Sequence, residues 1–158
     1  MVRRPNYSGI NDQVPRKVEV LIVDDNPGDL ALIRESFREC SLATEVIPAL
    51  DADRAFAILN DLSRNPPDLI ILDVNLPRID GFEVLRRIRA DERLNSTPVL
   101  MMSSSTMPAD VWRAYDLHAN AYVAKPSQLE DYFDIARGIA ALWLEPLANI
   151  SARSVEPV

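Results

Sequence analysis

The sequence predicts an α/β protein with a doubly wound parallel sheet of five strands. Two observations predict this fold class. Short apolar, β-type runs alternate with amphipathic runs of helical period along most of the chain. In addition, polar residues follow four of the apolar runs directly. Strands that alternate with helices form a parallel sheet covered on both faces. Such sheets bind ligands at the carboxyl ends of their strands.

The first half of the chain supplies three expected strands and two helices. VEVLIV is apolar and β-branched, as a buried strand is. Asn26 and Pro27 then offer a helix N-cap and a first-turn proline. Pro48 indicates an edge strand or a strand end for TEVIPAL, whereas PDLIILDV is the most hydrophobic run and should be central. The expected strands are 18–23, 44–50 and 67–74, and the second helix is 51–64.

The second half continues the alternation. Asp80 should begin a third helix, Pro108 a fourth, and Ser127 should cap the last. The expected helices end near Arg93, His118 and Leu144, and the expected strands are 97–103 and 121–125.

Length and charge limit the classes of function. The 158 residues fit one domain, expected at 18–145, with a polar lead-in at 1–17, a tail at 146–158 and no room for an output domain. The formal charge of −7 argues against attraction to nucleic acid or anionic membranes. No run fits a membrane span or a secretory signal, and the single Cys40 fits a reducing cytoplasm.

The residues at the strand ends predict phosphoryl chemistry. Asp24 and Asp25 follow the first strand, Asp73 the third, Ser103 ends the fourth and Lys125 the fifth. Clustered carboxylates need a compensating cation, and Mg²⁺ prefers such oxygen ligands. A lysine and a hydroxyl can hold anionic oxygens, and a carboxylate can be the nucleophile that forms an aspartyl phosphate. Asp73 is the best candidate because it stands on the central strand.

These segments resemble the receiver domain of two-component response regulators. The resemblance lies in VEVLIVDDNPGDL, LIILDVNLPRIDGFEVLRRIR, PVLMMSSS and YVAKP. It implies the flavodoxin-like, CheY-like (βα)5 fold with strand order 2-1-3-4-5. It implies that Asp73 is the phosphoacceptor and that the metal ligands are Asp24, Asp25, Asp73 and the backbone carbonyl of Asn75. It also implies that Ser103 and Tyr122 are switch residues, that Lys125 binds an anion, and that the peptide bond before Pro126 is cis.

Three segments of the chain resemble a narrower group, the stand-alone regulators of bacterial and cyanobacterial phytochromes. The resemblance lies in YDLHANAYVAKPSQLEDYFDIARGIAALWLEPLA, DNPGDLALIRESF and DVNLPRIDGFEVL. It implies a light-sensing histidine kinase as the phosphoryl donor. The chain has no P-loop or glycine-rich nucleotide loop, so the phosphoryl group must come from another protein or a small donor. We expect a single-domain signalling protein that catalyses only its own phosphorylation and dephosphorylation.

The last helix is apolar on more than one side, which is unusual for a soluble monomer. Either the C-terminal tail folds over the second face or a partner covers it. We expect a homodimer through the fourth helix, fifth strand and fifth helix. The expected partner-binding residues are Trp112, Tyr115, Tyr122, Phe133 and Trp143.

Three other functions are compatible with parts of the pattern. A phosphohydrolase or phosphotransferase with an aspartyl phosphate would carry a general acid where this chain has Asn75. A flavin carrier would need a glycine- and hydroxyl-rich loop where Asp24 and Asp25 stand. An adaptor that works without phosphorylation would not need the intact set of acids. Labelling by acetyl phosphate with Mg²⁺ separates these alternatives.

Overall fold

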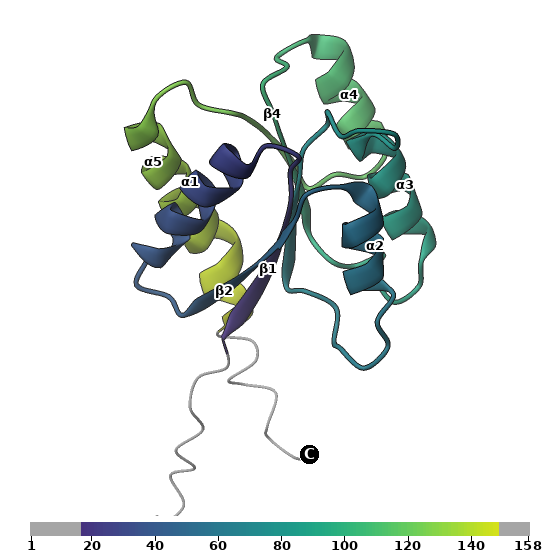
Figure 1. The fold of residues 1–158 in the computed structure, drawn as a ribbon, viewed down its shortest axis with the longest axis horizontal. Coiled ribbons are helices and arrows are strands. Elements are labelled where there is room, and N and C mark those ends of the chain that lie inside the picture. The colour runs from purple at the N-terminus through teal and green to yellow at the C-terminus, as the bar shows by residue number, and fades with distance from the viewer. Residues whose placement is uncertain (1–16, 149–158) are drawn as a thin grey trace, which may run out of the picture.

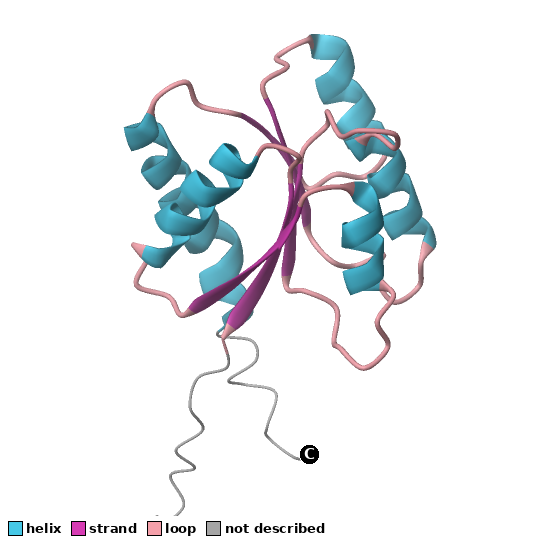
Figure 2. Cartoon of the chain, viewed as in Figure 1, coloured by secondary structure: helices cyan, strands magenta, loops and turns pink. Residues whose placement is uncertain are grey.

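A computed structural model of the protein describes residues 17–148, in which five parallel strands form one sheet (Figure 2). The strand order is β2-β1-β3-β4-β5, as the resemblance implied. The strands are β1 (Val18–Val23), β2 (Thr44–Ala49), β3 (Leu69–Leu72), β4 (Val99–Ser103) and β5 (Ala121–Ala124). The helices are α1 (Pro27–Arg38), α2 (Ala52–Leu59), α3 (Gly81–Ala90), α4 (Pro108–Asp116) and α5 (Leu129–Ile139), which continues as a π-helical turn η1 (Ala140–Leu144).

Helices cover both faces of the sheet (Figure 1). α1 and α5 lie on one face, and α2, α3 and α4 lie on the other. Alternate residues of a strand point to opposite faces, so β1 divides its side chains between two apolar clusters. Leu21 and Val23 pack toward α2 and α3, whereas Val20 and Ile22 pack toward α1 and α5. Strands buried on both faces explain the continuous apolar runs of the sequence.

The strand order places the expected site at the centre of one rim. β1 pairs with β3 from Val20↔Leu69 to Val23↔Leu72, so the residues after both strands emerge side by side. β2 is an edge strand, as Pro48 indicated. β3, the most hydrophobic strand, has a neighbour on each side and all four of its residues are buried.

Side-chain caps begin three of the helices where the sequence indicated. The carboxamide oxygen of Asn26 accepts hydrogen bonds from the amides of Gly28 and Asp29 at the start of α1. Asp51 caps α2 and Asp80 caps α3 in the same manner. These caps fix the turn from each of three strand ends into the next helix, and the turns after β1 and β3 carry the three aspartates of the candidate site.

Three local expectations were wrong. The second helix stops at Leu59 instead of residue 64, because the carboxylate of Asp61 binds the amide and hydroxyl of Ser63 in a local turn. The residue before the last helix is Gln128, and Ser127 does not cap it. No peptide bond in residues 17–148 is cis. The bond before Pro126 therefore has the trans form, which X-Pro bonds favour by about 0.5–1 kcal/mol. The expected lead-in, up to residue 16, and the tail beyond residue 148 lie outside the described residues.

Candidate functional site

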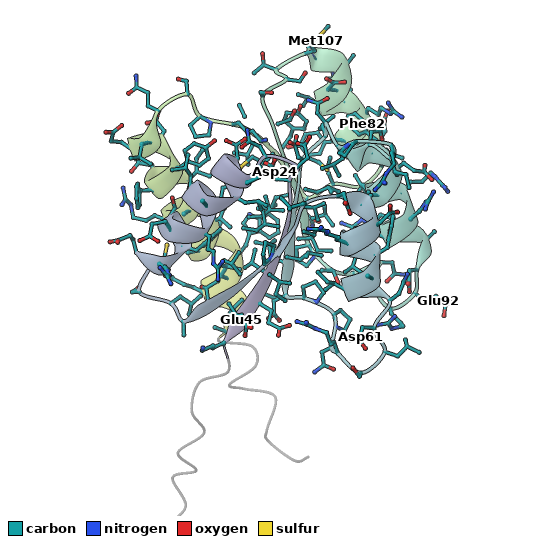
Figure 3. All side chains as sticks on the ribbon, in the orientation of Figure 1. Asp24, Glu45, Asp61, Phe82, Glu92 and Met107 are labelled. Atoms are coloured by element: carbon teal, nitrogen blue, oxygen red, sulfur yellow. The ribbon has the colours of Figure 1, made fainter. Side chains whose placement is uncertain are left out.

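Three aspartates meet at the carboxyl-terminal rim of the sheet. Asp24 and Asp25 follow β1, and Asp73 follows β3. Each can offer one carboxylate oxygen such that all three oxygens lie within 4.8 Å of one another. Asp24 and Asp73 are buried, with 2% and 4% of their surface exposed, whereas Asp25 is open to solvent. Asp24 lies at the upper end of the sheet in Figure 3, opposite to Glu45 at the start of β2.

Lys125, just beyond β5, provides a positive charge inside this acidic group. Its ammonium nitrogen lies 2.7 Å from Oδ2 of Asp24 and 2.8 Å from Oδ2 of Asp73. A third carboxylate, that of Asp29 in the first turn of α1, lies 3.0 Å away. The ammonium has three hydrogens, so each can be donated to a different carboxylate.

Burial and charge shift the pKa values of two of these groups. Desolvation raises the pKa of Asp24 above its ordinary value, although hydrogen bonds from Lys125 and the amide of Asn26 act in the opposite direction. Desolvation by itself would lower the pKa of Lys125. Its hydrogen bonds to Asp24, Asp73 and Asp29 outweigh that effect and raise it. Lys125 therefore stays charged at physiological pH.

Backbone contacts hold Asp73 in place. Its amide donates to the carbonyl of Val23 on β1 at 2.9 Å. One carboxylate oxygen, Oδ1, accepts the amide of Asn75 at 3.1 Å, which leaves Oδ2 for Lys125. Gly81, the first residue of α3, packs directly behind the Asp73 carbonyl, where any Cβ would lie only 2.0 Å from the oxygen. The start of α3 thus fixes the backbone that presents the carboxylate.

The carboxyl ends of β4 and β5 bring hydroxyl groups to the same rim. Ser103 is fully buried, its hydroxyl oxygen accepts the amide of Ser105 at 3.1 Å, and its carbonyl accepts the amide of Lys125 at 2.8 Å. Tyr122 is half-buried, and its hydroxyl donates to the carbonyl of Ser105 at 2.8 Å. The two expected switch residues are therefore joined through one residue of the loop between β4 and α4.

The donor set fits a small, hard divalent cation. Carboxylate oxygens are the ligands that Mg²⁺ and Mn²⁺ prefer, and Mg²⁺ keeps several waters when it binds few protein groups. The open side of Asp25 leaves room for such waters, while the clustered negative charge supplies the attraction. The side chain of Asn75 is exposed, and its expected role concerns only its backbone carbonyl.

Asp29 is a member of the site that the sequence pattern did not single out. Besides Lys125, it contacts the hydroxyl of Tyr132 on α5 at 3.5 Å. The sequence could have indicated Asp29, because it stands in the first helical turn after the acids at the end of β1. A side chain in that turn can point back to the rim of the sheet. Gly81 was also missed, since nothing in the sequence shows that α3 packs against Asp73.

The structure separates the five expected partner-binding residues. Trp112 and Tyr115 on α4 are 70% and 44% exposed. Tyr122 and Phe133 are half-buried, and Trp143 packs against the apolar cluster between α1, α5 and the sheet. Only the two α4 residues thus present large open aromatic surfaces.

Comparison with known proteins identifies the family. The model of the response regulator receiver domain matches residues 20–137, which is more than half of the chain. The chain belongs to the response-regulator receiver family. Receivers are signalling modules of two-component systems, they take signals from histidine kinases, and they bind divalent metal in an acidic pocket. The acids of this chain stand at the corresponding rim.

Several relatives are similar over most of their length. Response regulator Rcp1 of Synechocystis is 37% identical over 135 residues, which cover 83% of this chain and 91% of Rcp1. The phosphorylated cyanobacterial phytochrome response regulator RcpA has a similar crystal structure, with a TM-score of 0.78 and 36% identity over 83% of this chain and 96% of that one. The Mn²⁺-bound form of Rcp1 aligns with a TM-score of 0.75 and 35% identity, over 81% of this chain and 95% of that one.

Across residues 17–148 the helices are too short or too polar to cross a bilayer.

Proposed function

We propose that this receiver accepts a phosphoryl group on Asp73 and signals through protein–protein contacts. The observation that carries the proposal is that Asp73 lies 2.8 Å from Lys125 and within the group of three aspartates that could hold a metal ion. A nucleophilic carboxylate, a fixed ammonium and a cation site are the parts that phosphoryl transfer to an aspartate needs.

The chain's own residues would divide the work of the transfer. An oxygen of Asp73 attacks phosphorus, and the bond from phosphorus to the donor breaks as the leaving group takes its electron pair. Lys125 would bind one anionic oxygen of the incoming phosphoryl group, because its ammonium already donates a hydrogen bond to Asp73. The buried hydroxyl of Ser103 would donate to another oxygen once it turns toward Asp73.

A Mg²⁺ ion held by Asp24, Asp25, Asp73 and the carbonyl of Asn75 would supply positive charge against the phosphoryl oxygens. Asp24 and Asp25 are the main candidates for metal ligands, because an oxygen of Asp73 must also react with phosphorus. Without a cation, the carboxylates around Lys125 would repel an incoming phosphoryl group. We therefore expect phosphorylation to require the metal.

Asn75 supports a signal acceptor instead of an enzyme that turns over small substrates. A carboxamide cannot donate or remove a proton as a general acid or base. The aspartyl phosphate would therefore persist until water attacks it, and the chain would catalyse only its own modification and its loss. The phosphoryl group carries roughly −1.5 to −2 charges at pH 7 and replaces the single charge of the carboxylate. This would draw the Ser103 hydroxyl toward Asp73 and keep Lys125 beside it.

We propose a phytochrome-type histidine kinase as the donor, on the basis of the similarity to RcpA over 83% of this chain. A phosphohistidine on that kinase would supply the phosphoryl group to Asp73. Phosphotransfer from a purified phytochrome kinase at a rate far above that from an unrelated kinase would support this pairing. Equal rates from both kinases would contradict it.

We also propose a homodimer through α4, β5 and α5. The exposed large apolar residues of these elements support it, namely Trp112, Tyr115 and Leu129. A further exposed residue, Leu142 in η1, extends the same apolar character along the C-terminal helix. Sedimentation at tens of micromolar should give twice the chain mass, and Trp112→Glu should shift it to one chain mass. A parent that sediments as a monomer, before and after phosphorylation, would exclude the dimer.

Intact-mass spectrometry after incubation with acetyl phosphate tests the main proposal. The parent should gain one phosphoryl group with Mg²⁺ and none with excess EDTA. Asp73→Asn should gain none under either condition, whereas Asp116→Asn, an exposed acid at the end of α4, should behave as the parent. Labelling of Asp73→Asn at the parental level would refute the assignment, and labelling in EDTA would refute the metal requirement.

A further inference from the structure

The loop between β4 and α4 is tied to three parts of the molecule through Ser105. Its amide donates to the hydroxyl of Ser103 at 3.1 Å, and its carbonyl accepts the hydroxyl of Tyr122 at 2.8 Å. Its own hydroxyl donates to Oδ2 of Asp110 at 2.5 Å. All three polar groups of this half-buried residue are thus engaged, each with a different element.

Asp110 is the anchor that comes from α4. It lies in the first turn of that helix, one turn after Met107, which marks the upper end of α4 in Figure 3. Met107 is the N-cap residue and makes no side-chain hydrogen bond to the helix. The Asp110 carboxylate therefore has no reciprocal capping partner at the start of α4. It accepts a hydrogen bond from the Ser105 hydroxyl in the preceding loop, and a hydrogen bond to a charged acceptor is stronger than one between neutral groups.

We propose that Asp110 is a positioning residue for phosphorylation of Asp73. Through its bond to the Ser105 hydroxyl, Asp110 holds Ser105 in place. The Ser105 amide then holds the Ser103 oxygen, and the Ser103 O–H hydrogen stays free to turn toward Asp73. The inference rests on the proposed function for its effect on labelling, but the anchoring itself is a property of the resting protein. Asp110 touches no reacting atom, so it acts only through the residues that it holds.

The chain offers matched variants for a test. Asp110→Ala removes the acceptor, whereas Asp110→Asn keeps an oxygen that can accept from Ser105 and removes the charge. If the negative charge of Asp110 acted through the helix dipole of α4, both variants would lose its effect. If the hydrogen bond to Ser105 is what matters, only Asp110→Ala loses it. Asp116→Ala removes the same charge from the other end of α4, and Ser104→Ala removes the exposed hydroxyl beside Ser105.

The first measurement is amide hydrogen exchange at Ser105 by NMR in the metal-free protein, without phosphodonor. Asp110→Ala should exchange about tenfold faster than the parent, because the loop opens locally once its anchor is gone. Asp110→Asn and Asp116→Ala should stay close to the parent. Unchanged exchange in Asp110→Ala overturns the proposal, and so does an Asp110→Asn variant that exchanges as fast as Asp110→Ala.

The second measurement is the initial rate of labelling by acetyl phosphate with saturating Mg²⁺. Asp110→Ala and Ser105→Ala should each label about three- to tenfold more slowly. The double variant should label no more slowly than Ser105→Ala, because that variant already lacks the hydrogen bond to Asp110, together with the 3.4 Å bond from the Met107 amide. Ser104→Ala should label as the parent. Parental rates in both variants, or additive losses in the double variant, overturn the proposal. A parent that does not label refutes the proposed function instead, and amide exchange then decides the role of Asp110.

Discussion

A Cβ on Gly81 would lie 2.0 Å from the backbone oxygen of Asp73 and 2.8 Å from its carbonyl carbon. The amide of Gly81 also donates to the carbonyl of Val74 at 2.8 Å. The first turn of α3 and the end of β3 are therefore packed backbone against backbone. Only a residue without a side chain permits this contact, so the position of the candidate phosphoacceptor depends on a glycine eight residues later.

Gly81→Ala should displace Asp73 and destabilise the fold. Overpacking of a rigid contact costs about 1–3 kcal/mol, and the displaced carboxylate should label more slowly. Gly138→Ala in α5 is the matched control, because nothing lies within 4 Å of its Cβ position. There, alanine should raise the free energy of unfolding by about 0.5–1 kcal/mol. Urea denaturation of both variants checks this, and equal effects of the two substitutions would show that the contact is not rigid.

Lys125→Met should destabilise the metal-free protein by about 1–3 kcal/mol, because it leaves buried carboxylate oxygens without their donor. It should also abolish rapid labelling of Asp73. The chain's other lysine, Lys17, is exposed at the start of the described region, and Lys17→Met should change neither property. Denaturation in EDTA measures the effect. If Lys125→Met proved as stable as Lys17→Met, the Lys125 ammonium would not compensate the negative charge of the aspartates.

Mg²⁺ should stabilise the folded protein, because it binds the assembled rim and not the unfolded chain. At a concentration a hundredfold above its Kd, a ligand adds about 2.7 kcal/mol. For a chain of this length that corresponds to about 5–10 °C in Tm. Asp25→Asn should lose most of the shift, and Asp116→Asn should retain it. Thermal denaturation with Mg²⁺ and with EDTA provides the comparison; a full shift in Asp25→Asn would remove this residue from the metal site.

Asp24→Asn should stabilise the metal-free protein at pH 7, and the gain should shrink at lower pH. Burial raises the pKa of Asp24 above its ordinary value of 3.8, so the folded state takes up a proton more readily than the unfolded state. Ionised Asp24 therefore opposes folding above its folded pKa, and this penalty disappears as the pH falls toward 3.8. Denaturation curves of Asp24→Asn and the parent, recorded in EDTA from pH 7 toward 3.8, test whether the stability difference shrinks as the pH falls. The control is Glu92→Gln, an exposed acid far from the rim in Figure 3, which should show no such trend.

Features that depend on local patterns could be predicted from the amino-acid sequence. The alternation of apolar runs and helical segments gave the sheet, and the hydrophobicity of 67–74 correctly indicated the central strand β3. Asn26 and Asp80 cap the helices as expected, because a cap depends only on residues within one turn. The convergence of Asp24, Asp73 and Lys125 also followed, since parallel strands end at one rim.

Features that depend on contacts between distant segments were not predicted. Asp29 joins Lys125 across 96 residues of the chain, because the side chains from the first turn of α1 and the end of β5 meet at one rim of the sheet. The Ser105–Asp110 hydrogen bond depends on the path of one loop. The helical period of 51–64 predicts that Phe56 faces inward with Ala55 and Leu59, but Phe56 is only half-buried. There its ring lies 5.3 Å from the guanidinium of Arg87 on α3, a partner that the local pattern does not show.

Localisation of the phosphoryl group within the chain tests the central claim most directly. The protein would be labelled with acetyl phosphate and Mg²⁺, the acyl phosphate reduced with borohydride, and the digested peptides sequenced by mass spectrometry. A reduced aspartate at position 73, and at no other acid of the rim, is the expected result. Modification at Asp24, Asp25 or Asp29 with an unmodified Asp73 would contradict the account.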